Sequence, residues 1–436
     1  MFNRGMNVTD AGFLPSFFTA RNRSSVSALH PARPSGSPPR PHIVVGFTSP
    51  QTCLVLGGRL RTLREAGFRV TLVSSPGELL TRRAALEGVE SISIPMRREI
   101  APVADFLSLL RICWLLYRLK PDMTEFSTPK AGLLGTVAAR LCGVPVRVYL
   151  LRGLKLETSA GLKRRILLAA EKLASACSHV VVCNSESLRG EALALGLAPQ
   201  SKLHLLGSGS SSGVDVERFC PGPSQLRQRL GLPPDAKVVG FVGRMTRDKG
   251  LPELVRAFDA ILAGEPDAHL LLVGWFDMAD DALDDGLRCR INNHPRIHAT
   301  GFVADVAPYY RVMDVMVLPT WREGFPNVVL EAAASGIPVV TTLSTGSRDA
   351  VVPGVTGLLI PPGQPAAICE AVLQLLRNPE CRRRMGFAAR AWVIDHYVNG
   401  RVLGLAVRYY KSLLDRNRAA DARTAQVPVD SVLNPV

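Results

Sequence analysis

The segment "REGFPNVVLEAAASGIPVVTT", residues 322–342, holds one complete helix and the strand that follows it. Pro326 suits a first helical turn, Gly336 suits the residue just past a helix end, and Pro338 prevents the helix from continuing. We therefore expect a helix over about 327–335 that leads directly into a short apolar strand. Helices that alternate with buried strands in this way are typical of an α/β fold.

The same alternation extends over both halves of the chain. Short apolar runs predict buried parallel strands at 42–48, 69–75, 145–151 and 179–185, and again at 237–244, 269–275, 296–302, 315–320 and 337–342. Helical stretches separate them at 59–67, 131–142, 160–176 and 251–263. This order predicts two doubly wound, Rossmann-like domains whose sheets face a crevice at the carboxyl ends of their strands.

A chain of 436 residues is too long for one ordinary core, and the small residues of "GSGSSSGVD" at 207–215 mark the hinge between two domains. The predicted organisation is a disordered leader or overcalled start at 1–40, domains at 41–207 and 208–400, a last helix at 400–418 and a disordered tail at 419–436. Nine scattered cysteines, without a C-x-x-C pair or a cysteine–histidine grouping, fit a reducing cytoplasm.

The positive charge is concentrated in the first half. Residues 41–207 hold 22 basic and 12 acidic side chains, whereas residues 208–436 hold 25 and 24. Such an excess points to an anionic partner, either nucleic acid or a membrane surface with acidic lipids, and a basic face without a partner is the plain alternative. Nucleic acid is disfavoured because the sequence shows neither interleaved aromatic residues nor a recognisable reading motif.

The segment "VADFLSLLRICWLLYRLK" at 103–120 is the nearest approach to a membrane helix. Arg111 and Arg118 interrupt it, and no apolar run in the chain reaches the roughly 18 residues of a spanning helix. It could lie in a membrane interface. A buried helix packed on a sheet is favoured, because apolar helices on both faces of a sheet are normal in α/β domains.

Sequence motifs for cofactors are absent: no G-x-G-x-x-G follows the first strand, no P-loop occurs, and no H-E-x-x-H metal motif is found. Instead, Arg244 and Lys249 occupy the loop after the strand at 237–244, where a doubly wound sheet binds ligands. Two cations at this position can neutralise charge that develops on a diphosphate leaving group without a metal. Taken in isolation, both would be ordinary surface residues.

The two glutamates of the opening segment flank a predicted anion site. Glu323 precedes the helix and Glu331 lies one turn beyond its start. Free backbone amides at 325–328 and the positive end of the helix dipole can bind an anion, which Gly324 would allow to approach. A sugar nucleotide, with a negative middle and hydroxyls on both sides, fits this arrangement. Outside such a motif, Glu331 would read as an exposed or arginine-paired helix residue.

Three segments of the second half closely resemble the retaining glycosyltransferases of family four: "FVGRMTRDKG" (241–250), the opening segment, and "GVTGLLIPPG" (354–363). That family has the two-domain GT-B fold and a Glu-x-seven-Glu motif. The segments at 127–145, 161–175 and 207–219 are similar to the branch that builds capsule, O-antigen and other bacterial surface polysaccharides.

The resemblance implies a role for each candidate residue. Arg244, Lys249 and Glu323 would act on the donor diphosphate and sugar. The residues implied for donor binding are Gly243, Gly324, Phe325, Pro326, Asn327, Val328 and, on the ribose, Glu331. The loop of Thr48 and Ser49 would face the donor phosphates or the acceptor. We expect the acceptor-binding residues to be Thr48, Ser49, Glu125, Lys130 and Arg152. The resemblance further implies no metal and no cofactor, retention of configuration by front-face attack, and a last helix that crosses back onto the first domain.

The sequence departs from the family at two places. Many relatives carry His-x-His at the end of a first-domain strand and a later Val-His-Gly, whereas this chain reads Glu125-Phe-Ser127 and Leu-Arg152-Gly. We expect Arg152 to supply a permanent positive charge for an acceptor phosphate, with a structural ion pair as the alternative. Glu125 is expected to bind a sugar hydroxyl.

The predicted function is transfer of a hexose or N-acetylhexosamine, from a donor expected to be UDP-linked, to a polyprenyl-diphosphate-linked glycan in bacterial surface polysaccharide synthesis. The enzyme is expected to be cytoplasmic and peripheral on the inner face of the cytoplasmic membrane. The residues expected to dock on acidic lipids are Arg59, Arg61, Arg64, Arg82, Arg83, Arg97, Arg98 and those at 163–165. The alternative function is a non-catalytic sugar-nucleotide-binding subunit, which the missing histidines would favour.

Overall fold

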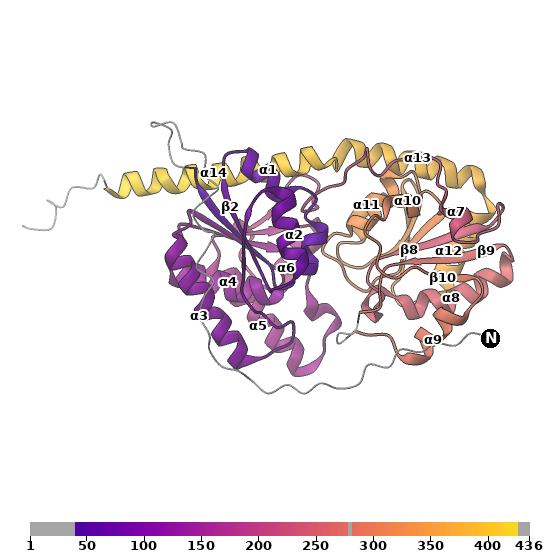
Figure 1. The fold of residues 1–436 in the computed structure, drawn as a ribbon, viewed down its shortest axis with the longest axis horizontal. Helices are drawn as coiled ribbons and strands as arrows, with labels where there is room; N and C mark the ends of the chain where they lie inside the picture. The colour runs from indigo at the N-terminus through magenta and orange to yellow at the C-terminus, as the bar shows by residue number, and fades with distance from the viewer. Residues whose placement is uncertain (1–39, 278–280, 426–436) are drawn as a thin grey trace, which may run out of the picture. The chain divides into compact units, whose positions relative to one another are not determined.

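Two parallel sheets carry the fold (Figure 1). The computed structural model describes residues 40–277 and 281–425. Every pairing between the named strands is parallel. The predicted leader lies outside the described residues except for Arg40, and so does the end of the predicted tail. The predicted α/β class with two doubly wound sheets is confirmed.

The first sheet has seven strands in the order β3-β2-β1-β4-β5-β6-β7. They are β1 (His42–Gly46), β2 (Arg69–Ser74), β3 (Glu90–Ser93), β4 (Met123–Ser127), β5 (Val146–Leu151), β6 (Val180–Cys183) and β7 (Leu203–Leu205). The helices between them are η1 (Pro50–Val55), α1 (Arg59–Glu65), α2 (Glu78–Glu87), α3 (Pro102–Leu119), α4 (Pro129–Leu141), η2 (Lys155–Thr158), α5 (Gly161–Cys177), α6 (Glu186–Ala194) and η3 (Gln200–Lys202). Because the strands are parallel, their carboxyl ends meet at one edge of the sheet.

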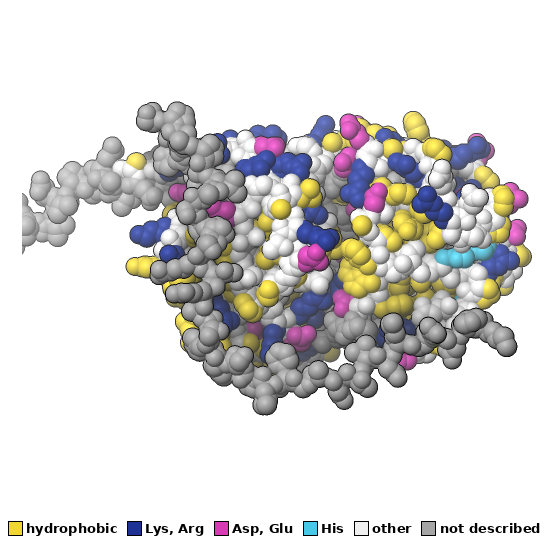
Figure 2. Space-filling view, in the orientation of Figure 1, with side chains coloured by type: hydrophobic (Ala, Val, Ile, Leu, Met, Phe, Trp, Pro, Cys, Tyr) yellow, Lys and Arg dark blue, Asp and Glu magenta, His cyan; other side chains and the backbone are white. Residues whose placement is uncertain are grey.

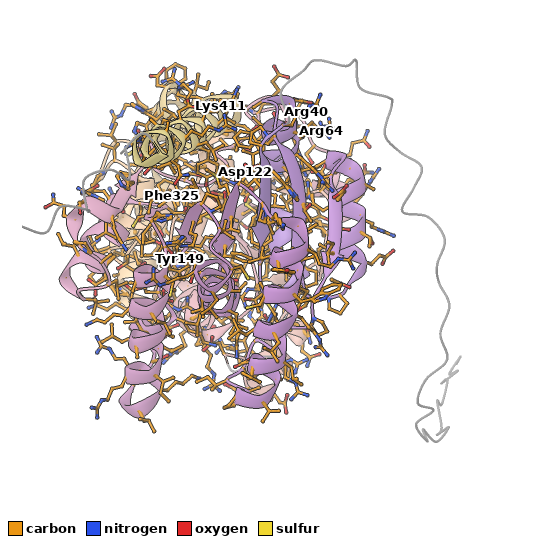
Figure 3. All side chains as sticks on the ribbon, turned by 90° about the vertical axis from the view of Figure 1, so that its left-hand side faces the viewer. Arg40, Arg64, Asp122, Tyr149, Phe325 and Lys411 are labelled. Carbon is orange, nitrogen blue, oxygen red and sulfur yellow. The ribbon has the colours of Figure 1, made fainter. Side chains whose placement is uncertain are left out.

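Successive residues of β1 enter different cores, because side chains alternate between the two faces of a strand. Val45 packs with α1, α2 and the last helix, α14 (Asn399–Ala425), whereas Val44 packs with α3 and α4. Helix α4 contacts α3 on one side and α5 on the other. In Figure 3, Lys411 of α14 lies at the top of the view, and Tyr149 of β5 lies below Lys411. The helices α3, α4 and α5 therefore cover the face opposite to α14.

The second sheet has six strands in the order β10-β9-β8-β11-β12-β13. They are β8 (Lys237–Val242), β9 (Ala268–Val273), β10 (Ile297–Ala299), β11 (Val315–Leu318), β12 (Val339–Thr342) and β13 (Gly357–Ile360). Its helices are α7 (Leu226–Arg229), η4 (Arg247–Lys249), α8 (Leu251–Gly264), α9 (Asp285–Asn293), α10 (Ala307–Tyr310), α11 (Asn327–Ala334), η5 (Arg348–Ala350), α12 (Pro365–Arg377) and α13 (Pro379–His396). A single large core of buried aliphatic and aromatic residues fills this half.

The nine predicted strands are all present, each shorter than predicted, but β3, β4, β7 and β13 were not predicted. Strand β4 was missed because "MTEFS" is polar, although every one of its residues is buried at the centre of the sheet. The other three are strands of three or four residues at the edges of their sheets, which are too short to show a clear periodic pattern.

Helix α3 packs on the first sheet through Ile112, Leu115 and Leu116, as the buried-helix alternative predicts. Its other face carries exposed apolar side chains. Within the described residues, no helix combines the length and the apolar character needed to cross a membrane.

A buried ionic network ties the last helix to the first sheet. Arg59 Nη2 donates to Glu125 Oε2 at 2.6 Å, and the hydroxyl of Tyr410 donates to the same oxygen at 2.5 Å. Arg59 Nη1 donates to the carbonyl of Ser211, in the predicted hinge, at 2.8 Å. Burial alone would raise the pKa of Glu125, but Arg59 and Tyr410 outweigh it and lower the pKa. The network joins α1, β4, the hinge and α14.

Replacing Glu125 by alanine should destabilise the protein strongly, because it leaves the buried Arg59 charge uncompensated. We expect a loss of about 3–5 kcal/mol in the free energy of unfolding, measured by chemical denaturation. The control Tyr410→Phe keeps the ion pair and should cost about 2 kcal/mol. Equal stability of Glu125→Ala and the wild type would contradict this account of the network.

Candidate functional site

Two loops at the carboxyl ends of neighbouring strands bring the first candidates together. The loop after β8 carries Arg244 and Lys249, and the loop after β11 carries Glu323. Lys249 Nζ donates to Glu323 Oε1 at 2.5 Å, and both side chains are largely buried. Shielding from water strengthens the attraction between these two charges.

A second ion pair links this edge of the second sheet to the first half of the chain. Arg244 Nη1 donates to Asp277 Oδ2 at 2.7 Å, and Arg98 Nη1 donates to the same oxygen at 3.4 Å. Arg98 Nη2 also donates to Ser49 Oγ at 3.1 Å. Burial alone would lower the pKa of Arg244, but its hydrogen bond to Asp277 and the nearby carboxylates outweigh burial and raise the pKa. Arg244 is therefore a permanent cation.

Asp248 fixes the loop that carries both cations. Its buried carboxylate accepts hydrogen bonds from Thr246 Oγ1 at 2.6 Å and from Arg322 Nη2 at 2.8 Å. Burial would raise the pKa of this carboxyl, but Lys249, Arg322 and the hydroxyl of Thr246 outweigh it and lower the pKa. The loop is thus tied to the residue directly before Glu323.

Gly324 contacts the first half of the chain through its backbone. A Cβ atom at this position would lie 1.9 Å from the carbonyl oxygen of Arg152 and 2.9 Å from the amide nitrogen of Gly153. Carbon atoms cannot approach so closely without displacing the backbone, so only glycine fits. The contact places the residue that follows β5 directly against the Glu323 loop.

Arg152 has cationic nitrogens without a partner. Its Nε and Nη2 atoms are buried, and within the described chain no group accepts a hydrogen bond from them. Its guanidinium carbon lies 5.7 Å from the centre of the Phe47 ring. Burial and the neighbouring charge of Arg59 lower the pKa of Arg152 to about 10, which still leaves it charged near neutrality. An anion would satisfy these nitrogens.

The start of α11 offers backbone amides to a ligand. The helix begins at Asn327, with Pro326 as the residue before it. Within the described residues, no hydrogen bond uses the amides of Gly324, Phe325, Asn327 or Val328. These amides and the positive end of the helix dipole are the groups from which the sequence predicts an anion site.

The side chains of Phe325 and Asn327 point to neighbouring protein groups. The ring of Phe325 is buried, with its centre 5.2 Å from that of Tyr397. Asn327 accepts a hydrogen bond from Ser210 Oγ at 3.1 Å and donates to Ser212 Oγ at 3.3 Å. Both residues therefore position the loop, and their backbone is the part left for a ligand.

Glu331 is paired with a tyrosine. Its Oε2 accepts a hydrogen bond from the hydroxyl of Tyr310 at 2.8 Å, and the same hydroxyl lies 3.3 Å from the carbonyl oxygen of Val328. Burial raises the pKa of Glu331 to about 7, although Tyr310 and, more distantly, Arg218 favour the ionised form. The carboxyl is thus half ionised near neutral pH, in contrast to the alternatives of a solvent-exposed or arginine-paired residue.

Thr48 and Lys130 hold the first-sheet side of the site. Thr48 Oγ1 accepts a hydrogen bond from the amide of Ala131 at 3.0 Å and so caps α4. Lys130 Nζ donates to the carbonyl of Glu99 at 2.6 Å and to the carboxylate of Asp105. Thr48 thus fixes the start of α4, and Lys130 ties α4 to the loop between β3 and α3 and to the first turn of α3.

Among the sequence-predicted residues, the structure brings together Ser49, Arg152, Arg244, Lys249, Glu323 and Gly324. Gly243 directly follows β8, and its amide donates to the carbonyl of Val273 at 2.9 Å. Glu125 lies instead in the buried network with Arg59 and Tyr410.

Sequence reasoning missed three charged residues of this cluster: Asp277, Asp248 and Arg98. Asp277 follows β9 at the ligand-binding edge, and Asp248 lies between the two predicted cations, so their positions in the chain were an available signal. Arg98 was predicted to dock on acidic lipids, but its guanidinium is paired with Asp277 and Ser49. No local signal shows this, because Arg98 meets Asp277 only in the folded chain. Within the described residues, no group of three or more His, Cys, Asp or Glu side chains is placed to hold a metal ion.

Two family models match the chain. The model described as glycosyl transferases group 1 matches residues 236–378, and the one described as glycosyl transferase 4-like domain matches residues 56–209. The capsular polysaccharide biosynthesis glycosyltransferase CapM of Staphylococcus aureus is 36% identical over 344 residues, which cover 79% of this chain and 90% of the relative. The UDP-Gal:alpha-D-GlcNAc-diphosphoundecaprenol alpha-1,3-galactosyltransferase of Escherichia coli is 27% identical over 281 residues, 63% of this chain and 71% of the relative.

Solved structures share the fold. HepE from Anabaena, in complex with UDP and glucose, superposes with a TM-score of 0.72 at 18% identity, over 85% of this chain and 99% of that chain. WaaG, a glycosyltransferase of lipopolysaccharide biosynthesis, superposes with a TM-score of 0.65 at 14% identity, over 84% of this chain and 98% of that chain. Both have the GT-B fold, which the two parallel sheets of this chain reproduce.

Replacing Gly324 by alanine should separate the Glu323 loop from Arg152, because the added methyl overlaps the Arg152 carbonyl. We expect a loss of about 1–3 kcal/mol in the free energy of unfolding. The control Gly190→Ala lies in α6, where an added Cβ meets no atom within 4 Å, and should not destabilise the protein. Equal behaviour of the two variants in chemical denaturation would contradict the predicted overlap.

Proposed function

This chain belongs to the group 1 glycosyltransferases, and from that premise we propose that it transfers a sugar from a UDP-linked donor to a polyprenyl-diphosphate-linked glycan, with retention of configuration and without a metal. The setting that we propose is synthesis of a bacterial surface polysaccharide. The names of CapM and of the E. coli galactosyltransferase support the setting and the acceptor class, and the UDP complex of HepE supports the donor nucleotide.

The observation that carries the proposal is the pair of cations at one sheet edge, each held by a carboxylate. Arg244 is paired with Asp277, and Lys249 with Glu323. A diphosphate that enters this edge would replace a carboxylate as partner of each cation, so the positive charges are already in place before the donor binds. Fixed cations lose little orientational freedom on binding and stabilise the charge that develops on the leaving group.

The donor sugar and ribose are assigned to the two glutamates. In our proposal the diphosphate releases Glu323 from Lys249. Glu323 then accepts hydrogen bonds from the hydroxyls of the donor sugar, beside the amides of 324–328. Glu331 accepts hydrogen bonds from the ribose hydroxyls in place of the one from the hydroxyl of Tyr310. This division gives the Glu-x-seven-Glu spacing a physical reason, because the amino end of α11, where we propose that the diphosphate binds, lies between Glu323 and Glu331 in the chain.

Bond changes in the proposed reaction balance without a protein base. The bond between the sugar C1 and the β-phosphate oxygen breaks, and the acceptor hydroxyl oxygen forms a new bond to C1 on the same face. The acceptor proton passes to the departing phosphate oxygen, which gives UDP and a glycan longer by one sugar. Arg244 and Lys249 stabilise the growing negative charge on that phosphate.

Arg152 is our candidate for the acceptor diphosphate. Its unpaired guanidinium nitrogens stand where many relatives have a histidine, and its backbone touches the loop of Glu323. A guanidinium stays charged at every physiological pH, unlike a histidine, and can donate hydrogen bonds to two phosphate oxygens at once. We assign residues 41–207 to acceptor binding and 208–400 to donor binding. We place the enzyme on the cytoplasmic face of the membrane, where such acceptors reside.

A panel assay tests the proposal. Purified protein is offered UDP- and GDP-sugars with polyprenyl-diphosphate mono- and disaccharides in the presence of a chelator. We expect one donor and acceptor pair to give product, with a loss of at least about a hundredfold in Arg244→Ala and Glu331→Ala, because each removes a group that holds the leaving diphosphate or the ribose. Product analysis by NMR gives the anomeric configuration.

The outcomes separate the proposal from its alternative. Donor binding without turnover across a broad acceptor set would support a binding subunit that has lost activity at Glu125, Ser127 and Arg152. Full activity of Arg244→Ala would contradict the assignment of the phosphate site. A requirement for a divalent ion would contradict metal-free transfer.

Donor affinity should depend on pH through Glu331. Its pKa in the free protein is raised to about 7 by burial, and ribose hydroxyls bind the ionised form better. The affinity for a UDP-sugar should therefore rise towards about pH 7, by up to roughly tenfold per pH unit, and level off above it. Isothermal titration of Glu331→Gln should show weaker binding without this slope. A flat wild-type profile would exclude Glu331 as the titrating group.

A further inference from the structure

Helix α3 presents a long apolar face to solvent. The exposed residues of this face recur at helical spacing and are Val103, Phe106, Leu107, Leu110, Trp114 and Tyr117. Trp114 is 60% exposed and Tyr117 is 72% exposed. In Figure 2, hydrophobic side chains reach the surface at the left margin, where Figure 1 places α3. Side chains of this size are not normally gathered on the solvent face of a helix.

Helix α5 repeats the pattern on the other side of α4. Leu162, Ile166 and Leu173 are exposed large apolar residues on one stripe of α5. Because α4 contacts both α3 and α5, the two stripes belong to the same side of the first sheet. We name the exposed residues of α3 and α5 together the apolar-basic face.

The charges of this face have one sign. The two helices hold only two acidic residues, Asp105 and Glu171. Asp105 is paired with Lys130, and Glu171 is buried and accepts a hydrogen bond from Tyr149. The exposed cations of the two helices, with the residue that follows α3, are Arg111, Arg118, Lys120, Lys163, Arg164, Arg165 and Lys172. The face thus combines apolar and positively charged side chains without an exposed carboxylate.

We propose that the apolar-basic face rests in the headgroup region of a bilayer that contains anionic lipids, with α3 and α5 parallel to the surface. Trp and Tyr favour this region, and Arg and Lys reach lipid phosphates while their stems cover apolar surface. The cations above attract an acidic leaflet. A second copy of the same face is a poorer partner, because it would bring like charges together.

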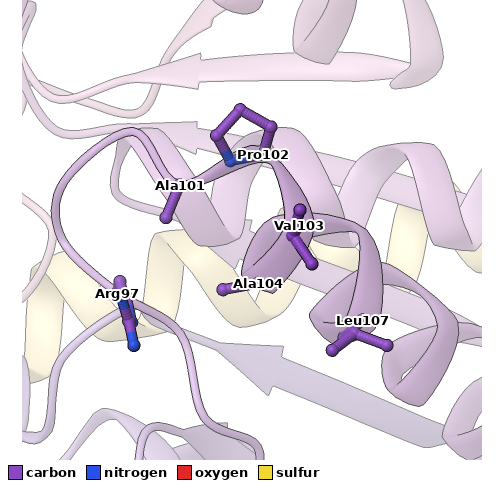
Figure 4. A pocket seen from close by; sticks show the side chains of 6 residues that line it. All are labelled: Arg97, Ala101, Pro102, Val103, Ala104 and Leu107. Atoms are coloured by element: carbon purple, nitrogen blue, oxygen red, sulfur yellow. The ribbon is translucent and has the colours of Figure 1, made fainter.

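The position of α3 connects this face to the candidate site. A hollow of about 340 Å³ lies at the amino end of α3, and Val103, Leu107 and Arg97 line it (Figure 4). Arg98, the next residue, donates to Asp277, the partner of Arg244. The loop before α3 thus carries Arg97 in the apolar hollow and, as the next residue, Arg98 beside the predicted phosphate site. This step rests on the proposed function, since a lipid-linked acceptor must meet the site at the bilayer.

The proposed face excludes the arginines of α1 and α2 that the sequence predicted to dock on lipids. Arg59 is 3% exposed and buried against Glu125, so the prediction for this residue was wrong. Three other arginines of α1 and α2 form ion pairs with glutamates: Arg64, Arg82 and Arg83. Those helices also cover the opposite face of the sheet from α3.

Sedimentation with vesicles tests the proposal on the full-length protein without substrates. Wild type should bind vesicles of phosphatidylcholine with phosphatidylglycerol, and bind less as salt rises. The double variant Trp114→Ala with Tyr117→Ala should partition at least about tenfold less. The variant Arg164→Glu with Arg165→Glu should lose at least about tenfold on acidic vesicles.

Matched controls come from the second half of the chain. Phe387 is an exposed apolar residue of α13, and Arg383 and Arg384 are exposed cations of the same helix. Phe387→Ala and the double change Arg383→Glu with Arg384→Glu should bind vesicles within about twofold of wild type, because these residues lie outside the proposed face. Equal losses in the controls would overturn the assignment of the face.

A conservative variant guards against a folding defect. Brominated lipids should quench tryptophan fluorescence of the wild type, and Trp114→Phe should remove most of this quenching while it keeps vesicle binding. Unchanged quenching in Trp114→Phe would overturn insertion of α3. A concentration-dependent dimer that the Trp114 and Tyr117 double variant abolishes would assign the face to a second copy instead.

The docking proposal and the proposed function fail separately. With a water-soluble, short-chain acceptor, the docking variants should transfer sugar at wild-type kcat/KM, because none of them lies at the candidate site. Loss of vesicle binding with intact transfer is the expected result. Vesicle binding by a wild type that transfers no sugar to any acceptor would leave docking standing and overturn the proposed function.

Discussion

The close contact between Gly324 and the backbone of Arg152 and Gly153 is the constraint on which the candidate site depends. It brings the loop after β11 in the second sheet against the residue after β5 in the first. Each sheet by itself presents only the carboxyl ends of its own strands. The absence of a side chain at one position lets the two edges meet and brings the backbone of Arg152 against the loop that carries Glu323.

The site is built from charges that compensate one another before any ligand arrives. Lys249 with Glu323 and Arg244 with Asp277 are close pairs, and Asp248 holds the loop between them through Arg322. Such pairs keep flexible cations fixed and ionised in a partly buried place. Arg152 differs, because its buried nitrogens have no such partner within the described chain. This contrast separates cations that already have carboxylate partners from one whose buried nitrogens have none within the described chain.

The first half of the chain uses its positive charges in two ways. Arg59, buried with Glu125 and Tyr410, fastens the last helix to the sheet, whereas the cations of α3 and α5 stay at the surface beside exposed apolar residues. Some of the excess positive charge is therefore buried and holds the fold together, and the rest lies on the surface. A net charge counted along the sequence gives no means of telling these uses apart, since burial is decided by packing.

The sequence by itself determined the α/β class, the strands with continuous apolar runs, helix α11 with its Gly and Pro boundaries, and the loop positions of Arg244, Lys249 and Glu323. These features follow from local patterns and from the rule that ligands bind at the carboxyl ends of parallel strands. Only the tertiary structure decided that polar β4 is a central strand, that Glu125 is a buried ion-pair partner, and that Asp277 and Arg98 join the cluster. The reason is physical: each of these outcomes depends on residues far apart in the chain, and no local pattern reports which distant group will satisfy a buried charge.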